Sequence, residues 1–573
     1  MSFIKAAGNA RQLSVIESAY SQELDSTTMH DSSEDSTEQK DFAVPDISFA
    51  ASSSVLGGTQ DPSQISSLTL NLLSTDDLHH QRQASKDIEK GDAATLSSDE
   101  SGPQVAEIAN HDKQDPFAQE SEGGVQYRTM AWWQASMVMI AETVSLGILS
   151  LPSALATLGL IPGLILLLSL GALSTYTGLV IGQFKLRHPH IHSMADAGMV
   201  LFGRIGGEII GVGQLLFFVF IMGSHILTFS IMMNAITSHA ACTIVFMLVG
   251  MALSFLLTIP RTLKNLSWWS ITSFISIIAA VTITMASISI SRPRIGKVDL
   301  WPNADVAFHQ AFLAVANIIF AYAGHVAFFT FISELRKPED FPKALCLLQG
   351  CDVAMYVITA VVIYHFAGDQ VKSPALDSAG PLVRKVAYGV AIPTIVVAGV
   401  VNGHVAVKYL YVRLFRNSGQ DGAKGGNIMY QTTFKARGIW VAINAVLWVV
   451  AWVIAEGVPV FNDLLGLTSA LFASWFTFGL SGLFWFSLNR GRWWCWKHWR
   501  MALGSVVAAL CFLIGLLICV IGLYASSMSI RANSQRKMAG GSFSCADNSG
   551  AKIVGDLGGG KVVEGRALAL CSI

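Results

Sequence analysis

The stretch Met139-Ile-Ala-Glu-Thr-Val-Ser-Leu-Gly-Ile-Leu-Ser-Leu-Pro152 is apolar enough to lie in a membrane, yet several of its residues weaken a helix. Thr143, Ser145 and Gly147 disfavour a regular helix, and Pro152 suits the first turn of a new one. In hydrocarbon every backbone polar group needs a partner, so an interrupted helix persists only where it lines a cavity or binds a ligand. The sequence therefore predicts a break in this span over residues 143–147.

A second interrupted stretch, Phe320-Ala-Tyr-Ala-Gly-His325, has Gly324 as the expected helix breaker and an ionisable histidine at membrane depth. The first stretch opens one set of five apolar spans, and the second stretch opens the next five. Broken helices in corresponding positions of two halves indicate a transporter site where inverted repeats meet. The alternative for either stretch alone is that its small residues only let neighbouring helices pack closely.

The two stretches belong to a long apolar region in which we predict eleven membrane spans, each with the roughly 20 residues that cross a bilayer core. The predicted spans are residues 131–157, 161–184, 208–236, 241–260, 266–290, 306–335, 346–368, 384–414, 436–456, 459–487 and 501–525. The sequence therefore predicts an all-α polytopic membrane protein with a transporter domain over residues 129–525. Its two repeats cover about residues 131–290 and 306–487, and the eleventh helix follows at about 501–525.

The charged residues are divided unevenly along the chain. Of 573 residues, 13% are charged, against roughly 25% in soluble domains, and the formal net charge is -1. Residues 1–128 hold 8 Lys and Arg against 22 Asp and Glu, so this Ser-rich segment is acidic and is predicted to be a disordered cytoplasmic tail. It is either a plain solvated tail or a surface on which trafficking or ubiquitin-ligase machinery acts through phosphorylation or lysine modification.

The orientation is predicted from the loops. With the N-terminus inside, the cytoplasmic loops hold seventeen Lys and Arg and the outer loops hold six, which agrees with the tendency of cationic loops to stay cytoplasmic. The odd number of spans then makes the tail 526–573 extracytoplasmic. Cys545 and Cys571 could form a disulfide there, or both could be free thiols. The eight cysteines show no CxxC spacing, so no metal site is predicted.

Two ionisable residues accompany the two predicted breaks. A carboxylate at membrane depth costs at least about 2.5 to 3.5 kcal/mol, so Glu142 should face a cavity, be paired or be protonated, and all three suit proton coupling. The alternative is a Glu fixed by hydrogen bonds to nearby backbone. His325 is either a second titrating group or a neutral donor that holds the unwound backbone of the first span, and we favour the second role.

Other polar residues in the spans are weaker candidates for the same cavity, because a satisfied interhelical hydrogen bond explains each of them alone. They are Ser224, His225, Asn402, His404 and Lys408. A basic group in the eighth span would take the place of a coupling sodium ion, which favours protons. Three acidic residues near span ends are predicted to be interfacial: Glu208, Asp352 and Glu456.

Three rival classes of function are weighed against a transporter. A channel is disfavoured because the chain has no TVGYG-like filter and no repeated ring of charges. An enzyme is disfavoured because neither HExxH nor GxSxG occurs. A sensor that binds an amino acid and signals through the acidic tail stays open as an alternative.

Two motifs carry a resemblance to a known family. Gly147-Ile-Leu-Ser-Leu-Pro152, and Phe320-Ala-Tyr-Ala-Gly-His-Val-Ala-Phe-Phe-Thr-Phe-Ile-Ser-Glu334 followed by Lys337-Pro338, resemble the first- and sixth-span signatures of the amino acid/auxin permease family. Within it, the chain is most similar to the fungal neutral amino acid permeases of the methyltryptophan-resistance type, over about residues 125–548. The resemblance implies a LeuT-type five-plus-five inverted repeat with one extra helix, and proton-driven symport of neutral amino acids by alternating access.

The resemblance also implies roles for individual residues. The substrate-binding positions are Thr143, Val144, Ser145, Leu146, Gly147, Ala321, Tyr322, Ala323 and Gly324, and the ion-coupling or gating positions are Glu142, His325, Glu334, Asn402 and His404. Sodium-coupled relatives carry an Asn where this chain has Ala141 and Glu142, so the proton is the expected coupling ion and sodium the alternative. The implied partners are an amino acid and the lipid bilayer, with no nucleic acid and no cofactor. The expected location is the plasma membrane, with the vacuolar membrane as the alternative.

Overall fold

The computed structural model describes residues 128–261, 263–291, 296–415, 433–491, 499–536 and 541–549. Within these residues, ten helices are long and apolar enough to cross a membrane, and Thr243–Thr258 is a shorter apolar helix. Together they account for the eleven predicted spans, so the chain is an all-helical membrane protein, as predicted. The predicted acidic tail lies outside the described residues apart from Arg128, and so do residues 550–573.

The helices follow one another as two sets of five spans and a last helix. The first set is α5 (Trp132–Leu158), α6 (Leu160–Arg187), α7 (Met194–Thr237), α8 (Thr243–Thr258) and α9 (Leu263–Ser291). The second set begins with the sixth span, which consists of α10 (Phe308–Ala321), η1 (Gly324–Ala327) and α11 (Phe328–Glu334). The seventh span is η2 (Pro338–Asp340) with α12 (Phe341–Ala367), and the short helices η3 (Gly368–Gln370) and η4 (Ala375–Ser378) follow it. The eighth and ninth spans are α13 (Pro381–Phe415) and α14 (Phe434–Gly457), and the tenth is α15 (Phe461–Thr468) with the π-helical η6 (Ser469–Gly479) and α16 (Leu480–Leu488). The last helix is α17 (Trp499–Arg536).

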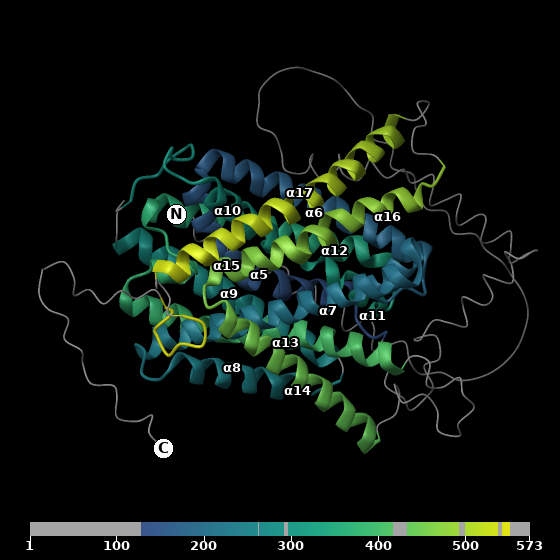
Figure 1. Cartoon of the computed structure of the whole chain (residues 1–573), viewed down its shortest axis with the longest axis horizontal. Coiled ribbons are helices and arrows are strands. Elements are labelled where there is room, and N and C mark those ends of the chain that lie inside the picture. The colour runs from purple at the N-terminus through teal and green to yellow at the C-terminus, as the bar shows by residue number, and fades with distance from the viewer. Residues whose placement is uncertain are drawn as a thin grey trace, which may run out of the picture. The chain divides into compact units, whose positions relative to one another are not determined.

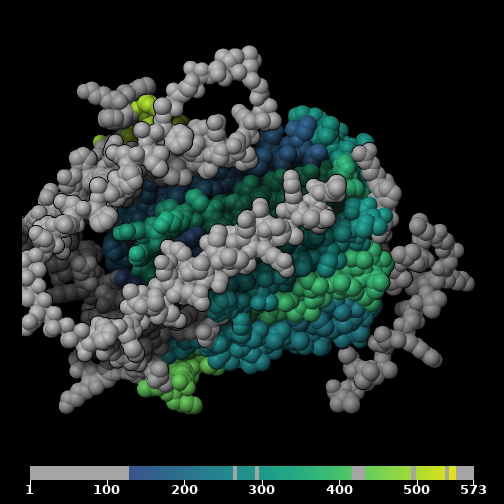
Figure 2. All heavy atoms as spheres, turned by 180° about the vertical axis from the view of Figure 1, so that it is seen from behind, coloured from purple at the N-terminus to yellow at the C-terminus, as the bar shows by residue number. Residues whose placement is uncertain are grey.

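Four helices of the first set pack against their counterparts in the second. The pairs are α5 with α10, α6 with α12, α7 with α13, and α8 with α14. Figure 1 shows α8 and α14 side by side at one edge of the bundle, and α17 crosses its opposite side. Seen from behind in Figure 2, teal and green helices again lie side by side along one face. This pairing agrees with the expected repeat and brings α5 and α10 together in the interior.

The first span is a continuous helix, so the break predicted at residues 143–147 is wrong in this structure. Its polar side chains bond to their own helix instead of interrupting it, since Thr143 Oγ1 donates to the Met139 carbonyl oxygen at 3.0 Å. Gly147 allows close packing, because a Cβ at this position would lie 2.6 Å from Cα of Ala321 on α10. The close-packing alternative therefore applies to the first stretch.

The sixth span is broken, as predicted. α10 ends at Ala321, and the helix resumes only at Gly324, the first residue of η1. A Cβ at position 324 would lie 2.6 Å from Cγ2 of Thr143, so a glycine lets the break pack directly against α5. The break itself thus lies at Tyr322 and Ala323, just before Gly324, and the glycine brings the two spans together.

The C-terminal segment 541–549 is tied to the end of the bundle where α7 ends and α8 begins. Cys545 forms a disulfide with Cys242 and not with Cys571, which lies outside the described residues. The Asn548 side chain also exchanges hydrogen bonds with two side chains of α7. We call this end of the bundle, marked by the Cys242–Cys545 bond, the disulfide end.

Candidate functional site

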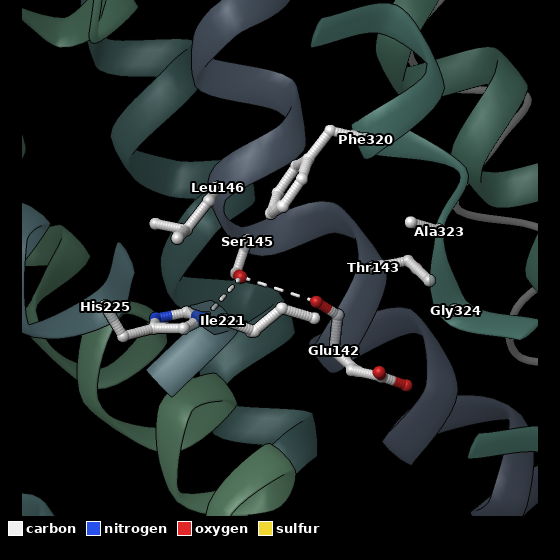
Figure 3. A pocket seen from close by; sticks show the side chains of 9 residues that line it. All are labelled: Glu142, Thr143, Ser145, Leu146, Ile221, His225, Phe320, Ala323 and Gly324. Atoms are coloured by element: carbon white, nitrogen blue, oxygen red, sulfur yellow. Dashed lines mark hydrogen bonds between the residues drawn. The ribbon is translucent and has the colours of Figure 1, made fainter. Parts of the chain in front are cut away.

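A small pocket lies where α5, α7 and the broken sixth span meet (Figure 3). It is lined by Glu142, Thr143, Ser145, Leu146, Ile221, His225, Phe320, Ala323 and Gly324. Its volume is about 20 Å³, room for about one water molecule, so the pocket is nearly closed in this structure. Seven of these nine residues are predicted site candidates, and Ile221 and Phe320 were not predicted.

Four of the predicted substrate-binding residues do not line this pocket. Gly147 and Ala321 lie against each other where α5 meets α10. Val144 is part of the buried apolar core. The Tyr322 side chain leaves the pocket and donates a hydrogen bond to the Leu167 carbonyl oxygen on α6 at 3.1 Å.

His225 of α7 presents a hydrogen-bond acceptor to the pocket. Its Nδ1 lies 2.8 Å from the carbonyl oxygen of Ile395, which can only accept, so Nδ1 carries the hydrogen of the neutral ring. Nε2 is then the acceptor, and it lies 3.5 Å from Ser145 Oγ (Figure 3). A side chain proposed only as a weak candidate therefore belongs to the pocket.

Glu142 and Asp352 form a pair of buried carboxyl groups beside the pocket. Glu142 is 8% exposed, and Asp352 of α12 is 0% exposed. Asp352 Oδ1 lies 3.3 Å from Thr143 Oγ1, and the two carboxyl groups interact electrostatically. One oxygen of each, Glu142 Oε2 and Asp352 Oδ2, has no hydrogen-bond partner in the described part of the chain.

The predicted interfacial position of Asp352 is wrong. α12 begins at Phe341 and not at residue 346, so Asp352 lies eleven residues into the helix, about 16 Å at 1.5 Å per residue. This position faces α5 and not the membrane surface. The prediction failed because hydropathy locates the centre of a span better than its ends.

His325 is buried but does not line the pocket. Its Nε2 lies 2.9 Å from the Ser174 carbonyl oxygen and 3.1 Å from Thr177 Oγ1, both on α6. Its Nδ1 lies 3.2 Å from the Tyr322 carbonyl oxygen. The prediction that His325 holds the backbone of the first span is therefore wrong: the ring braces the break in the sixth span against α6.

Asn402 and His404 of α13 also lie away from the pocket. The Asn402 side chain donates to the Ala398 carbonyl oxygen of its own helix at 3.0 Å. The His404 ring packs against Trp440 of α14, with ring centroids 5.4 Å apart. Ser224, likewise, bonds within α7. For these three residues the structure favours the packing alternative over a place in the site.

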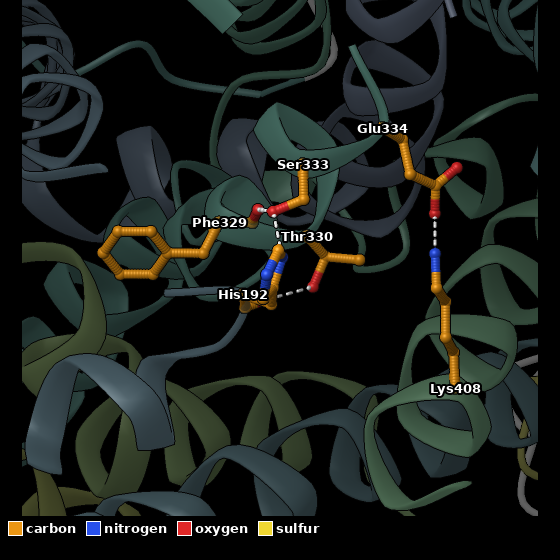
Figure 4. Close-up of polar contacts among 6 residues, drawn as sticks. All are labelled: His192, Phe329, Thr330, Ser333, Glu334 and Lys408. Carbon is orange, nitrogen blue, oxygen red and sulfur yellow. Dashed lines mark hydrogen bonds and ion pairs between the residues drawn. The ribbon is translucent and has the colours of Figure 1, made fainter. Parts of the chain in front are cut away.

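A larger cavity lies at the opposite end of the bundle from the disulfide, where α11, the start of α7 and the end of α13 meet. Figure 4 shows the polar contacts of His192, Ser333 and Lys408, which line this cavity. Its volume is about 380 Å³, and it is lined by His192, Ser193, Asp196, Met199, Arg204, Glu208, Thr330, Ser333, Lys408, Tyr409, Val412 and Arg413. Lys408 forms an ion pair with Glu334, and the two side chains are 7% and 4% exposed. We call this end, marked by the Glu334–Lys408 pair, the ion-pair end.

Polar residues at the two ends of the bundle are held by contacts with neighbouring segments. At the ion-pair end, His192 Nδ1 lies 2.9 Å from Ser333 Oγ, and the exposed Glu208 pairs with Arg413 at 2.5 Å. Glu456 lies near the end of α14, as predicted, yet it is buried. The C-terminal segment covers it, because the backbone N–H of Phe543 donates to the Glu456 carbonyl oxygen at 3.3 Å.

Comparisons with known proteins agree on one class. The family model described as transmembrane amino acid transporter protein matches residues 128–528. The N amino acid transport system protein of Neurospora crassa is 38% identical over 75% of this chain and 91% of its own length. A transmembrane transporter of Gibberella moniliformis is 33% identical over 75% of this chain and 90% of its own. The crystal structure of MhsT in complex with L-phenylalanine covers 72% of this chain and 100% of its own, with 13% identity and a TM-score of 0.45.

Proposed function

The chain belongs to the transmembrane amino acid transporter family, and from this premise we propose that it carries neutral amino acids by proton-coupled symport. The pocket beside the broken sixth span supports the proposal. Its walls Leu146, Ile221 and Phe320 are apolar and suit an uncharged side chain. Backbone groups freed at a helix break can bind the carboxylate and ammonium of a zwitterion.

The proton is the proposed coupling ion because of Glu142. This carboxyl reaches the pocket, lies at membrane depth and has an oxygen without a partner in the described residues. A proton removes the cost of its charge without requiring the several oxygen ligands that a metal cation needs. Sodium coupling remains the alternative.

Uptake by the purified full-length protein in liposomes is expected to follow an imposed pH gradient and to ignore sodium. One proton carried per amino acid would let a gradient of one pH unit drive about tenfold accumulation. The measurement is uptake of each of the twenty amino acids at two pH values, with sodium replaced by choline. Sodium-dependent uptake with no response to pH would reject the proposal.

Alternating access is the proposed mode of action, with the ion-pair end facing the cytoplasm. Disulfides form in oxidising compartments, which supports an extracytoplasmic location for the Cys242–Cys545 bond. The predicted charge asymmetry of the loops agrees with this orientation. The larger cavity then opens on the cytoplasmic side. We propose the plasma membrane as the location, with the vacuolar membrane as the alternative.

The orientation has a direct test by labelling of cysteines in sealed, right-side-out vesicles. In a Cys571→Ser background, Cys242→Ser frees the thiol of Cys545, which should then react with an impermeant maleimide. Cys346, exposed near the start of α12, should react only after permeabilisation. Labelling of Cys346 in sealed vesicles, or glycosylation of Asn265 in the sequon Asn265-Leu-Ser267, would reverse the orientation.

A further inference from the structure

We propose that Asp352 and Glu142 together form the proton site of this transporter, and that the pair holds a single shared proton which is exchanged through the pocket. The inference rests on the proposed proton coupling. It adds to that proposal a second carboxyl, contributed by α12, and a defined number of protons. It also accounts for a buried acidic residue that no other part of the structure neutralises.

Three spans bring the two carboxyl groups together. α5 carries Glu142 and Thr143, and α12 carries Asp352, whose Oδ1 is 3.3 Å from Thr143 Oγ1. The broken sixth span closes over them at Gly324. A Cβ added there would lie 2.6 Å from Thr143 Cγ2 and 3.8 Å from Glu142 Oε2. The two carboxyl groups therefore lie in an enclosed space between packed helices.

No cationic group neutralises this pair among the residues that the structure describes. The titratable neighbours of Asp352 are Glu142, Tyr322, Tyr356 and Cys351. The two phenol groups do not donate hydrogen bonds to the carboxyl groups. The Tyr356 hydroxyl donates to the Ala321 carbonyl oxygen at 2.7 Å, and the Tyr322 hydroxyl donates to the Leu167 carbonyl oxygen on α6. We therefore assign the lowering of the charge of this pair to a proton taken up from solution.

The nearby histidines do not provide the missing proton either. His225 lies across the pocket and has its Nδ1 hydrogen committed to the Ile395 carbonyl oxygen. His325 on η1 has both ring nitrogens at carbonyl oxygens, on α6 and on the break itself. These histidines thus have no hydrogen to offer the pair, and the proton that the pair binds is taken up from solution.

One proton satisfies the pair better than none or two. Two charged carboxylates in a medium of low dielectric constant repel each other strongly and leave both orphan oxygens unpaired. One proton removes this repulsion between two charges, and the two groups then titrate as a coupled pair. With two protons both groups would be neutral acids, and the pair would keep no charge that could respond to a change at the pocket.

The arrangement also provides a route for the proton and a link to the substrate. Glu142 reaches the pocket, whereas Asp352 is sealed behind it, so the proton enters and leaves through Glu142. Thr143 Oγ1 lies within reach of both the Met139 carbonyl oxygen and Asp352 Oδ1, so its hydrogen can change acceptor with the charge of Asp352. Gly324 packs on Thr143, so a change in the hydrogen bond between Thr143 and Asp352 is transmitted to the break in the sixth span.

The test is Asp352→Asn in the full-length protein, reconstituted in liposomes. Under a gradient of one pH unit, the wild type should accumulate substrate about tenfold, and D352N should stay near equilibrium while it still exchanges substrate at symmetric pH. The rate of exchange should also lose its dependence on pH, which a purely structural residue would not control. Asp463→Asn is the matched control: Asp463 is a buried carboxyl on α15 that is bonded to Ser529 and Asn533 of α17.

The outcomes separate this inference from the proposed function. Wild-type uptake that ignores pH would reject the proposed coupling itself. Proton-driven wild-type uptake together with normal accumulation by D352N would overturn only the role of Asp352. If D352N does not reach the membrane, Asp352→Glu decides: it should retain accumulation with a displaced pH midpoint, and an unchanged midpoint would overturn the inference.

Discussion

Glu142→Gln is expected to abolish concentrative uptake while exchange of substrate across the membrane continues. The amide of Gln has nearly the size of the carboxyl group and keeps a polar atom at the pocket, but it cannot gain and release a proton as a carboxyl group does. A pH gradient of one unit should then drive no accumulation, against about tenfold in the wild type. The measurement is uptake and counterflow of labelled substrate in liposomes made from the same preparation.

Asp340→Asn is the control for this variant, because Asp340 is a carboxyl paired with the exposed Lys343 and lines neither of the two cavities. It should accumulate substrate as the wild type does. Normal accumulation by E142Q would show that Glu142 has a structural role. It would also contradict the proposal that the proton enters and leaves through Glu142. Loss of both uptake and exchange would instead place Glu142 in substrate binding.

The two predicted helix breaks had different outcomes for a physical reason. In both stretches small and polar residues weaken the helix, but in α5 the Thr143 hydroxyl bonds to the Met139 carbonyl oxygen of the same helix and is accommodated without a break. In the sixth span α10 ends at Ala321, and the Tyr322 hydroxyl bonds to the Leu167 carbonyl oxygen on α6, not to its own helix. Single-sequence patterns identify residues that weaken a helix and do not show which hydrogen bonds will compensate.

The pocket was partly predictable for a similar reason. Glu142 could be identified because a carboxylate deep in a span is costly and therefore conspicuous. Asp352 has the same property, but its depth depends on where α12 begins, and the hydropathy pattern placed that start five residues too late, at 346 in place of Phe341. Ile221 and Phe320 were missed because apolar residues in an apolar span carry no signal of their own.

The roles of the histidines depended on rotation about the helix axis. His325 directly follows Gly324, which faces α5, but the tight turn of η1 directs the imidazole toward α6. His404 and Asn402 are in the correct span at a plausible depth, yet they face α14 and their own helix. Depth can be predicted from sequence, whereas the face that a residue presents is decided by packing.

Lys408→Met is expected to be the most destabilising single change discussed, because it leaves the Glu334 carboxylate buried without its partner. Removing one member of a buried ion pair typically costs about 3 to 5 kcal/mol. The thermal unfolding temperature of the purified protein, followed by size-exclusion chromatography after heating, should fall markedly. Lys343→Met is the matched control, since Lys343 forms an exposed pair with Asp340 whose loss should cost less than about 1 kcal/mol.

The double variant Glu334→Gln with Lys408→Met distinguishes charge from packing. If the large loss in K408M comes from an uncompensated charge, removing the second charge should restore most of the stability, because an uncharged buried pair no longer carries the desolvation cost. Since the pair lies beside the cavity at the ion-pair end, the restored protein should also differ from the wild type in its rate of exchange. A double variant as unstable as K408M would show that the Lys408 side chain stabilises the bundle by packing and that the ion pair does not control this end.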